Sequence, residues 1–353
     1  MHATRPLLDD PPVTAGIHHA LPSSRVEENG EAYTGDANST SASRKMANPC
    51  VSVVIPVFNA AAYVKETIDS ALRQTYQHIE IVVVDDGSSD GSLALLRSYE
   101  PRIKVLSQAN GGASLARNRG VRESSGDILA FLDADDVWDP AKVERQVSVL
   151  TRYPGALAVY CDHRIIDAEG NITGSSGALA QPRTSGQLLR SLILGNFIIS
   201  PSLIMLRRTA FEQVGGFDES ARAAEDYDLW MRIAATGPIL YMLDTLVSYR
   251  RHGRNKFSGE TLESHLATLR ALTNIRPYVE RSRNASLRAV LHQATYNQLM
   301  SIAWHHGLKG RHGQAIRRYI DAVKTNPLSL APILGMSKSI LRYLKGLTSF
   351  GYR

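Results

Sequence analysis

Apolar runs and amphipathic stretches alternate along the first half of the chain. Val51–Phe58 and Ile79–Gly87 are rich in β-branched residues, as fully buried parallel strands are. Between them, apolar residues from Val64 to Leu72 recur at helical spacing. Further strands are expected at Ile103–Leu106 and Asp127–Asp136, and further helices at Ser92–Tyr99, Ala113–Glu123 and Pro140–Tyr153. This order of elements predicts a parallel sheet that is covered by helices.

The alternation becomes less regular after residue 153. Strands are expected at Ala156–Ile166, Ser202–Arg207 and Ile239–Tyr249, and helices at Gln187–Leu194 and Asp226–Thr236. The stretch Gly170–Gly186 is rich in Gly, Ser and Pro and is predicted to be a mobile loop. From Thr261 onward the pattern is helical throughout. The whole predicts an α/β fold with a mostly parallel, Rossmann-like central sheet, helices on both of its faces, and a C-terminal helical extension.

These patterns divide the chain into three regions. They are a disordered N-terminal segment at 1–48, an α/β domain at 49–257 with halves at 49–153 and 154–257, and a helical extension at 258–353. Disorder is predicted for the first region because it has no apolar periodicity and cannot bury enough surface to offset its ordering entropy. Met46 lies just before the first strand and is a candidate start of translation.

Composition narrows the class of protein. Hydrophobic residues make up 43% of the 353 residues and charged residues 21%, as in ordinary globular proteins. The two cysteines, Cys50 and Cys161, are too few for a disulfide framework or a four-cysteine zinc site, and they fit a reducing compartment. No apolar run reaches the ~20 residues that a membrane-spanning helix needs. We therefore expect a cytoplasmic protein, either free or peripheral on the inner face of the membrane.

Charge is distributed unevenly along the chain. Residues 259–353 hold 14 Lys and Arg against 4 Asp and Glu, a net charge of +10. The remaining residues hold 26 Lys and Arg against 30 Asp and Glu, a net charge of −4. A basic extension on a mildly acidic body suggests that the extension meets an anionic partner. A solvated charged face would look the same in the sequence, so both interpretations remain open.

Acidic residues gather where two predicted strands end. Asp85 and Asp86 end the second strand, and Asp133, Asp135 and Asp136 end the fourth. In an open parallel sheet, ligands bind outside the carboxyl ends of the strands. Two carboxylates spaced i, i+2 can reach one hard cation, and Mg²⁺ and Mn²⁺ prefer such oxygen ligands. The alternative is turn and helix-cap chemistry, which we favour for Asp90.

Six segments resemble, in order and spacing, the family 2 glycosyltransferases with the A-type nucleotide-sugar-binding fold. They are PVFNAAAYVKETIDSALRQTY, IEIVVVDDGSSDGS, GGASLARNRG, GDILAFLDADD, GGFDE and AEDYDLWMR, within about residues 50–255. The resemblance implies an inverting, metal-dependent enzyme of surface polysaccharide biosynthesis. Such an enzyme would move a sugar from a nucleotide-sugar donor, expected to be a UDP-sugar, to a hydroxyl of a glycan or lipid-linked acceptor.

The resemblance also assigns residues to the nucleotide. They are Pro56, Val57, Asn59, Asp85, Asp86, Gly112, Arg117, Asp133 and Ala134. Within this set, Asp86 matches the acid that hydrogen-bonds the pyrimidine, Asp85 supports it, and Arg117 is expected to lie near the nucleotide.

Metal binding and catalysis are assigned in the same way. The resemblance implies that Asp133, Asp135 and His252 hold Mg²⁺ or Mn²⁺, with Asp135 preferred as the direct ligand. It implies that Asp226 is the base that removes the acceptor's hydroxyl proton, with Glu225 as the second candidate. From the local sequence alone, these two acids read as the start of a helix, where the helix dipole favours them.

Three other functions remain as alternatives. A nucleotidyltransferase would need a Gly-rich, basic phosphate loop after the first strand. The chain reads PVFNAAAYV there and has no such loop, which disfavours this alternative. A catalytically inactive, nucleotide-binding scaffold is disfavoured by the intact Asp133, Asp135 and Asp226. A nucleic-acid partner is not expected, because the basic extension lacks interleaved aromatic residues. The basic helices could instead dock on an anionic membrane surface.

Overall fold

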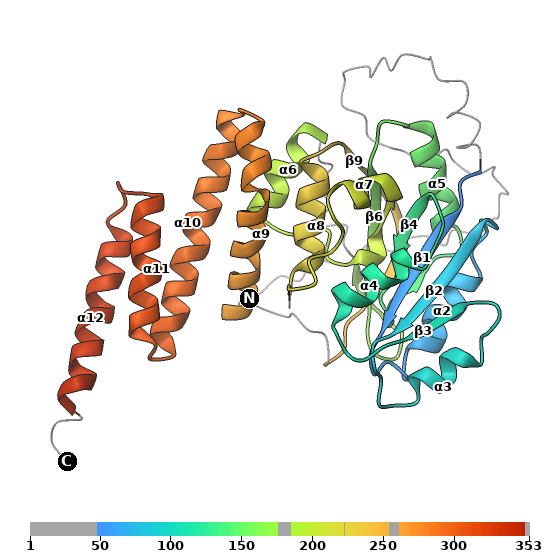
Figure 1. The fold of residues 1–353 in the computed structure, drawn as a ribbon, viewed down its shortest axis with the longest axis horizontal. Coiled ribbons are helices and arrows are strands. Elements are labelled where there is room, and N and C mark those ends of the chain that lie inside the picture. Colours follow the sequence, from blue (N-terminus) through green and yellow to red (C-terminus); the bar gives the residue numbers. More distant parts are fainter. Residues whose placement is uncertain (1–47, 176–184, 222, 254–260, 350–353) are drawn as a thin grey trace, which may run out of the picture.

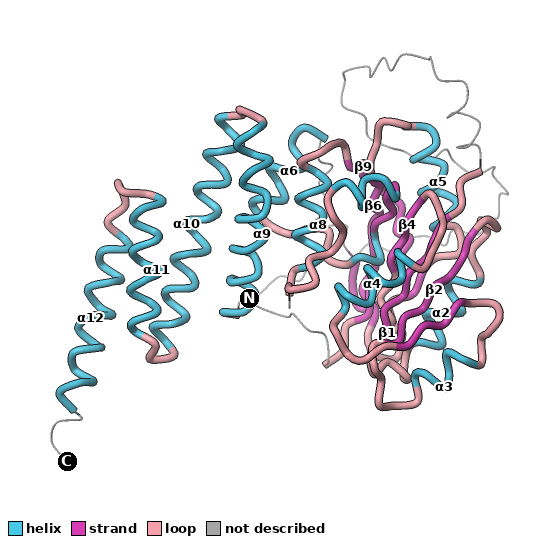
Figure 2. Tube along the Cα trace, viewed as in Figure 1, coloured by secondary structure: helices cyan, strands magenta, loops and turns pink. Residues whose placement is uncertain are grey.

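The computed structural model describes residues 48–175, 185–221, 223–253 and 261–349 (Figure 1). The disorder predicted for 1–48 and the candidate start at Met46 therefore concern residues outside the described part, apart from residue 48. Within the described part, the chain forms one sheet flanked by helices and then a row of long helices that leads away from it (Figures 1 and 2).

The first half of the sheet is parallel. Its strands are β1 (Val51–Val57), β2 (Ile79–Asp85), β3 (Lys104–Ser107) and β4 (Ile128–Phe131). They lie in the order β3-β2-β1-β4, with β1 between β2 and β4. Because all four run in one direction, the acidic residues that follow β2 and β4 lie at the same edge of the sheet.

The second half of the sheet is mixed. Its strands are β5 (Val137–Trp138), β6 (Ala158–Ile166), β7 (Ile172–Ser175), β8 (Ile204–Arg207) and β9 (Ile239–Arg250). Strand β8 lies between β4 and β6 and is antiparallel to both, whereas β9 is parallel to β6. The described strands continue in the order β4-β8-β6-β9-β5. The short strands β5 and β7 are antiparallel to β9 and β6.

Strand β7 corrects part of the predicted loop Gly170–Gly186. Its hairpin with β6 turns at Asp167, whose side chain accepts hydrogen bonds from the backbone N–H groups of Glu169 and Asn171. Gly170 in this turn has a φ of 92°, which glycine adopts readily. The turn chemistry was therefore present in the sequence. Of the rest of the predicted loop, 176–184 lies outside the described residues, and its last two residues belong to the helix that begins at Ser185.

Helices cover both faces of the sheet. They are α2 (Val64–Leu72), α3 (Ser92–Arg97), α4 (Ala113–Arg122), α5 (Lys142–Arg152), α6 (Ser185–Leu194), α7 (Arg208–Gln213) and α8 (Glu225–Ala234). Alternate residues of β2 show the two layers: Val82 and Val84 pack with Ala116 of α4, whereas Ile81 and Val83 belong to the main core. The predicted α/β class with a helical extension is confirmed.

The helical extension continues the packing of the domain. It contains α9 (Leu262–Arg281), α10 (Ala285–Leu308), α11 (His312–Thr325) and α12 (Ala331–Ser349), each beside the next (Figure 1). Leu272 and Ile275 of α9 and Leu291 of α10 are buried in the same core as the sheet. A smaller core beyond it contains Ala303 and Tyr319. No helix among the described residues is long and apolar enough to cross a membrane.

The contact between α4 and β1 gives a test of the packing. A Cβ on Gly120 of α4 would lie 2.4 Å from Cγ1 of Val54, whose branched side chain cannot easily move aside. We expect Gly120→Ala to lower the free energy of unfolding by about 1–3 kcal/mol, measured by urea titration.

The matched control for this substitution is Gly313→Ala in α11, where a Cβ would have no neighbour within 4 Å among the described atoms. This change should be neutral or raise the free energy of unfolding by up to about 1 kcal/mol, because alanine favours the helix. Equal effects of the two substitutions would contradict the close packing of α4 on β1.

Candidate functional site

The ends of β1 and β2 are bonded together. The backbone N–H of Asp86 donates to the Val57 carbonyl at 2.7 Å. In the following loops, the N–H of Asn59 donates to Ser88 Oγ, and Asn59 Oδ1 accepts from the N–H of Ser89 at 2.8 Å. Asn59 itself has a φ of 50°, a left-handed conformation that asparagine tolerates. The predicted nucleotide residues Pro56, Val57, Asn59, Asp85 and Asp86 are thus neighbours at one edge of the sheet.

Asp86 is buried and anchors the loop before α4. Its carboxylate accepts from the backbone N–H groups of Gly111 (2.9 Å) and Gly112 (2.7 Å) and from Gln108 Nε2 (2.8 Å). Oδ1 of its neighbour Asp85 is buried and has no hydrogen-bond partner within the described residues. Asp86 therefore positions the loop, and Asp85 offers an acceptor that no described donor uses. The pyrimidine contact assigned to Asp86 stays a prediction.

Arg117 of α4 joins the acids at the end of β4 to those at the start of α8. Its guanidinium is buried and donates from Nη2 to Asp133 Oδ1 at 2.6 Å and from Nη1 to Glu225 Oε1 at 3.0 Å. The guanidinium carbon also lies 5.3 Å from the centre of the Phe217 ring. The end of β4 and the start of α8 are thereby held by one cation. The structure brings together three of the predicted site residues that lie far apart in the sequence.

Asn118, the next residue, holds the turn before α8. Its Oδ1 accepts from the backbone N–H of Phe217, and its Nδ2 donates to the Phe217 carbonyl and to Glu219 Oε1. Gly216, in this turn, has a φ of 71°, and a Cβ there would lie 3.0 Å from Asn118 Oδ1 and the Phe211 ring. The ARN and GGFDE segments are therefore two sides of one contact.

Asp135 and His252 form the second part of the acidic edge. His252 Nε2 lies 2.9 Å from Asp135 Oδ2, and its ring stacks on Tyr63 with centroids 4.9 Å apart. Burial and the neighbouring Asp133 raise the pKa of Asp135, whereas His252 lowers it. Burial and the neighbouring carboxylate thus disfavour the charged form of Asp135, and a bound cation would favour it.

Asp136 and Arg250 hold the backbone of this acidic edge in place. The carboxylate of Asp136 is fully buried and accepts from the Arg250 backbone N–H and from Ser200 Oγ, both at 3.0 Å. Burial and the charges of its two acidic neighbours raise its pKa well above the usual range. The Arg250 side chain donates to the Asp135 carbonyl and to Glu66. The loop after β4 is therefore bonded to β9 and to α2.

Sequence reasoning assigned no role to Asp136, Ser200, Arg250 or Tyr63. Asp136 is the third acid of DADD, within one of the segments that carry the resemblance, and Arg250 lies two residues before the predicted ligand His252. The contact of Arg250 with the residues after β4 depends on β9 lying beside β5 and β6, which local patterns do not reveal. Ser200 carried no sequence signal.

The metal roles of Asp133, Asp135 and His252 stay a prediction, because each side chain is already engaged with another residue of this chain. Asp133 Oδ1 is bonded to Arg117 and its Oδ2 to Ser200, at 3.3 Å, while Asp135 and His252 face each other. Within the described residues, no three His, Cys, Asp or Glu side chains are grouped closely enough to hold a metal. Mg²⁺ is commonly held by one or two carboxylates together with substrate phosphates, which is compatible with this arrangement.

Asp226 is the second residue of α8 and is partly buried. The helix follows Ala224, which has a left-handed φ of 53°, an uncommon conformation for alanine. Burial and Glu225 raise the pKa of Asp226 to about 7, against the opposing effects of the Tyr227 backbone N–H and Arg117. A carboxyl group with this pKa is suited to accept a proton near neutral pH.

Comparisons with known proteins show which family the sequence resembles. Residues 52–215 match the family model described as glycosyl transferase family 2. An uncharacterized glycosyltransferase of Rickettsia prowazekii is 37% identical over 216 residues, which are 58% of this chain and 65% of that protein. A chondroitin synthase of Escherichia coli is 32% identical over 210 residues, 59% of this chain and 30% of that protein. The chain therefore spans less than two thirds of the length of these relatives.

The fold resembles that of a solved glycosyltransferase. The crystal structure of S. aureus TarS in complex with UDP-GlcNAc superposes with a TM-score of 0.62 at 18% identity, over 86% of this chain and 93% of that chain. Residues 1–253 make up less than 86% of the chain, so the superposition extends into the helices α9–α12. The likeness covers both the sheet and part of the helical extension.

The Arg117 bridge predicts strong coupling between its partners. In a double-mutant cycle with Arg117→Met and Glu225→Gln, the free energies of unfolding should be non-additive by about 1–3 kcal/mol, because the pair is largely buried. The control cycle uses Arg122→Met and Glu219→Gln, an exposed pair at 3.5 Å. Its coupling should stay below about 1 kcal/mol. Similar coupling in both cycles would contradict the structural role given to Arg117.

The raised pKa of Asp226 predicts a pH-dependent effect on stability. Since the pKa is about 7 in the folded chain and about 3.9 in an unfolded one, the folded state binds this proton more tightly. The contribution to stability is present below about pH 4 and is lost as the pH rises through about 7.

The substitution Asp226→Asn replaces the ionisable carboxyl group and therefore removes this loss of stability at higher pH. The variant should therefore gain more Tm over the wild type at about pH 8 than at about pH 5, as measured by thermal unfolding. Glu280→Gln, a change at an exposed position of α9, is the control and should give the same small difference at both values. An Asp226→Asn gain that does not depend on pH would show that Asp226 is not destabilised by its charge.

Proposed function

We propose that the chain, whose residues 52–215 match the glycosyl transferase family 2 model, moves a sugar from a nucleotide-sugar donor to a hydroxyl of a glycan or lipid-linked acceptor, with inversion. The observation that carries this proposal is the buried bridge from Asp133 through Arg117 to Glu225. It places the acids at the end of β4, where ligands of such a sheet bind, next to the acids of α8.

The roles of the acids follow from their surroundings. Asp226, with a pKa of about 7, accepts the proton of the attacking acceptor hydroxyl. Glu225 raises that pKa by its charge, and Arg117 keeps Glu225 in place. Asp226 is thus the base, and Glu225 and Arg117 position and tune it.

The donor side rests on the ends of β1, β2 and β4. Asp86, with Asp85 in support, is the residue that we propose to hydrogen-bond the N3–H of a uracil ring. The buried Asp85 Oδ1, which no described donor uses, supports a UDP-sugar donor with such an N–H group. A divalent cation, when bound, would offset the charge of the departing diphosphate, and Asp133, Asp135 and His252 are the side chains that we propose to hold it. Arg250 and Asp136 fix the backbone that carries these ligands.

The acceptor is proposed from the relatives and from charge. The name of the E. coli relative, chondroitin synthase, supports a glycan acceptor and a place in polysaccharide biosynthesis. The basic helical extension supports an acceptor at an anionic membrane surface, which would place the enzyme on the cytoplasmic face of a membrane. An inactive scaffold that only binds a nucleotide is the second candidate.

Thermal unfolding with UDP, GDP, CDP and dTDP, each with Mn²⁺ or with EDTA, tests the donor site. We expect UDP with Mn²⁺ to raise the Tm of the wild type, because a ligand that binds only the folded state stabilises it by mass action. The shift should be lost with EDTA and in Asp135→Ala. It should persist in Asp226→Asn and in Glu280→Ala, which removes an exposed acid of α9.

Turnover separates the enzyme from the scaffold. Release of UDP from UDP-glucose or UDP-GlcNAc should fall by about 10²–10⁴ in Asp226→Asn, as expected when a general base is removed. Stabilisation by UDP without any UDP release from the wild type would favour the scaffold. No stabilisation by any of the four nucleotides would contradict the proposed donor site.

A further inference from the structure

The end of the helical extension carries an exposed face that is both apolar and basic. We call it the α10–α12 face and define it by Trp304 and Leu308 of α10 and by Leu334, Lys338 and Arg342 of α12. These five side chains line one groove of about 400 Å³. Trp304 is 56% exposed and Leu334 is 63% exposed. Large apolar side chains gathered at such exposure mark a surface that contacts another molecule or an apolar phase.

Close packing of α12 on α11 shapes this face. A Cβ on Gly335 would lie 2.5 Å from the Tyr319 ring of α11, so only glycine allows the two helices to approach this closely. Leu334, Lys338 and Arg342 are spaced i, i+4 and i+8 and therefore share one side of α12. Leu341, at i+7 and 60% exposed, extends the apolar part of that side.

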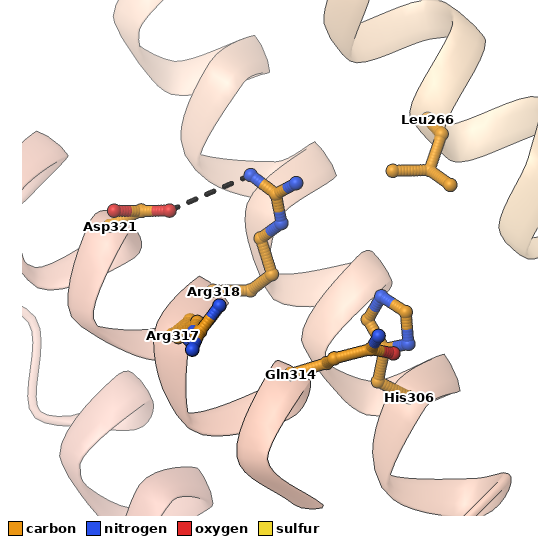
Figure 3. A pocket seen from close by; sticks show the side chains of 6 residues that line it. All are labelled: Leu266, His306, Gln314, Arg317, Arg318 and Asp321. Carbon is orange, nitrogen blue, oxygen red and sulfur yellow. Dashed lines mark ion pairs between the residues drawn. The ribbon is translucent and has the colours of Figure 1, made fainter. Parts of the chain in front are cut away.

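The extension around this face is strongly basic. Residues 285–349 contain nine Lys and Arg and one acidic residue, Asp321. A second groove, between α9, α10 and α11, shows the same excess. Its lining consists of Leu266, His306, Gln314, Arg317, Arg318 and Asp321 (Figure 3). Burial and then the nearby Arg311, Arg318 and Lys309 lower the pKa of the His306 imidazole, as expected in a positive potential.

We propose that the α10–α12 face docks on an anionic lipid surface. Its apolar side chains would lie at the boundary between headgroups and acyl chains, and its two basic side chains would lie on the lipid phosphates. Tryptophan is enriched at this boundary because its ring is amphipathic. The inference deepens the proposed function, on which its biological meaning rests, by naming the surface that brings the enzyme to a lipid-linked acceptor.

Charge favours lipid over a second copy of the chain as the occupant. Two α10–α12 faces would each bring Lys338 and Arg342 into the contact, and among the described residues α10–α12 offer one acid, Asp321, to pair with them. Asp321 lies in the second groove, 3.6 Å from Arg318. Like charges in such a contact are unfavourable, whereas an anionic membrane complements them.

Helix α10 connects this face to the sheet. Its first half is buried in the main core at Leu291, and its second half carries Trp304 and Leu308. Thirteen residues of helix separate Leu291 from Trp304, a distance of roughly 20 Å along the axis. The face is therefore held at a fixed distance from the core that carries the candidate site.

Co-sedimentation of the full chain with phosphatidylcholine vesicles, with and without phosphatidylglycerol, tests the proposal. We expect binding to the anionic vesicles only. Two double variants should each weaken this binding at least tenfold. One combines Trp304→Ala with Leu334→Ser, and the other combines Lys338→Glu with Arg342→Glu. Arg97→Glu with Arg102→Glu reverses two exposed charges at α3 and the turn after it, and is the matched control that should keep binding.

Three outcomes would overturn the proposal. They are no binding of the wild type, equal loss in the control variant, and self-association without vesicles that the same face variants abolish. The last would assign the face to a second copy of the chain. The Tm shift caused by UDP is measured in parallel, so that the two proposals can fail separately. If the chain binds the vesicles but is not stabilised by UDP, the docking face is retained and the donor site is rejected.

Discussion

The buried guanidinium of Arg117 is the interaction on which the arrangement of the site depends. A buried cation is tolerated only when it is paired, and here its partners are Asp133 after β4 and Glu225 at the start of α8. Removing either partner would leave the cation with an incomplete set of bonds. The acidic edge of the sheet and helix α8 therefore cannot be positioned independently.

The site keeps more negative charge than its own cations offset. The pKa values of Asp135 and Asp136 are raised by burial and by acidic neighbours, and that of Asp226 is raised by burial and Glu225. Such repulsion costs stability in the free protein, and it is relieved when a cation or a proton arrives. Arg250 and His252 hold the acids in place without neutralising them all. The cost to stability and the capacity for chemistry have the same origin.

Local patterns predicted most of the parallel half of the fold, because buried strands, helical spacing and acids at strand ends are signals within about ten residues. They could not predict that β8 enters between β4 and β6 in the opposite direction, since that pairing joins distant segments. In the site, the motifs located the acids correctly at the sheet edge. The partners of Arg117 lie 16 and 108 residues away, so their contact could not be read from spacing. For Glu225 the local signal even favoured a helix-dipole role.

The junction between sheet and extension is a continuous packed layer. Asp228 on α8 is bonded to Arg232, which in turn donates to the carbonyls of Val214 and Gly216, and Asp228 also accepts from Asn274 on α9. Shortening the chain after β9 would thus remove one donor from a buried carboxylate and uncover the apolar side of α8. A shortened chain that keeps this junction closed therefore has to include α9 and, because Leu291 belongs to the same core, the first half of α10.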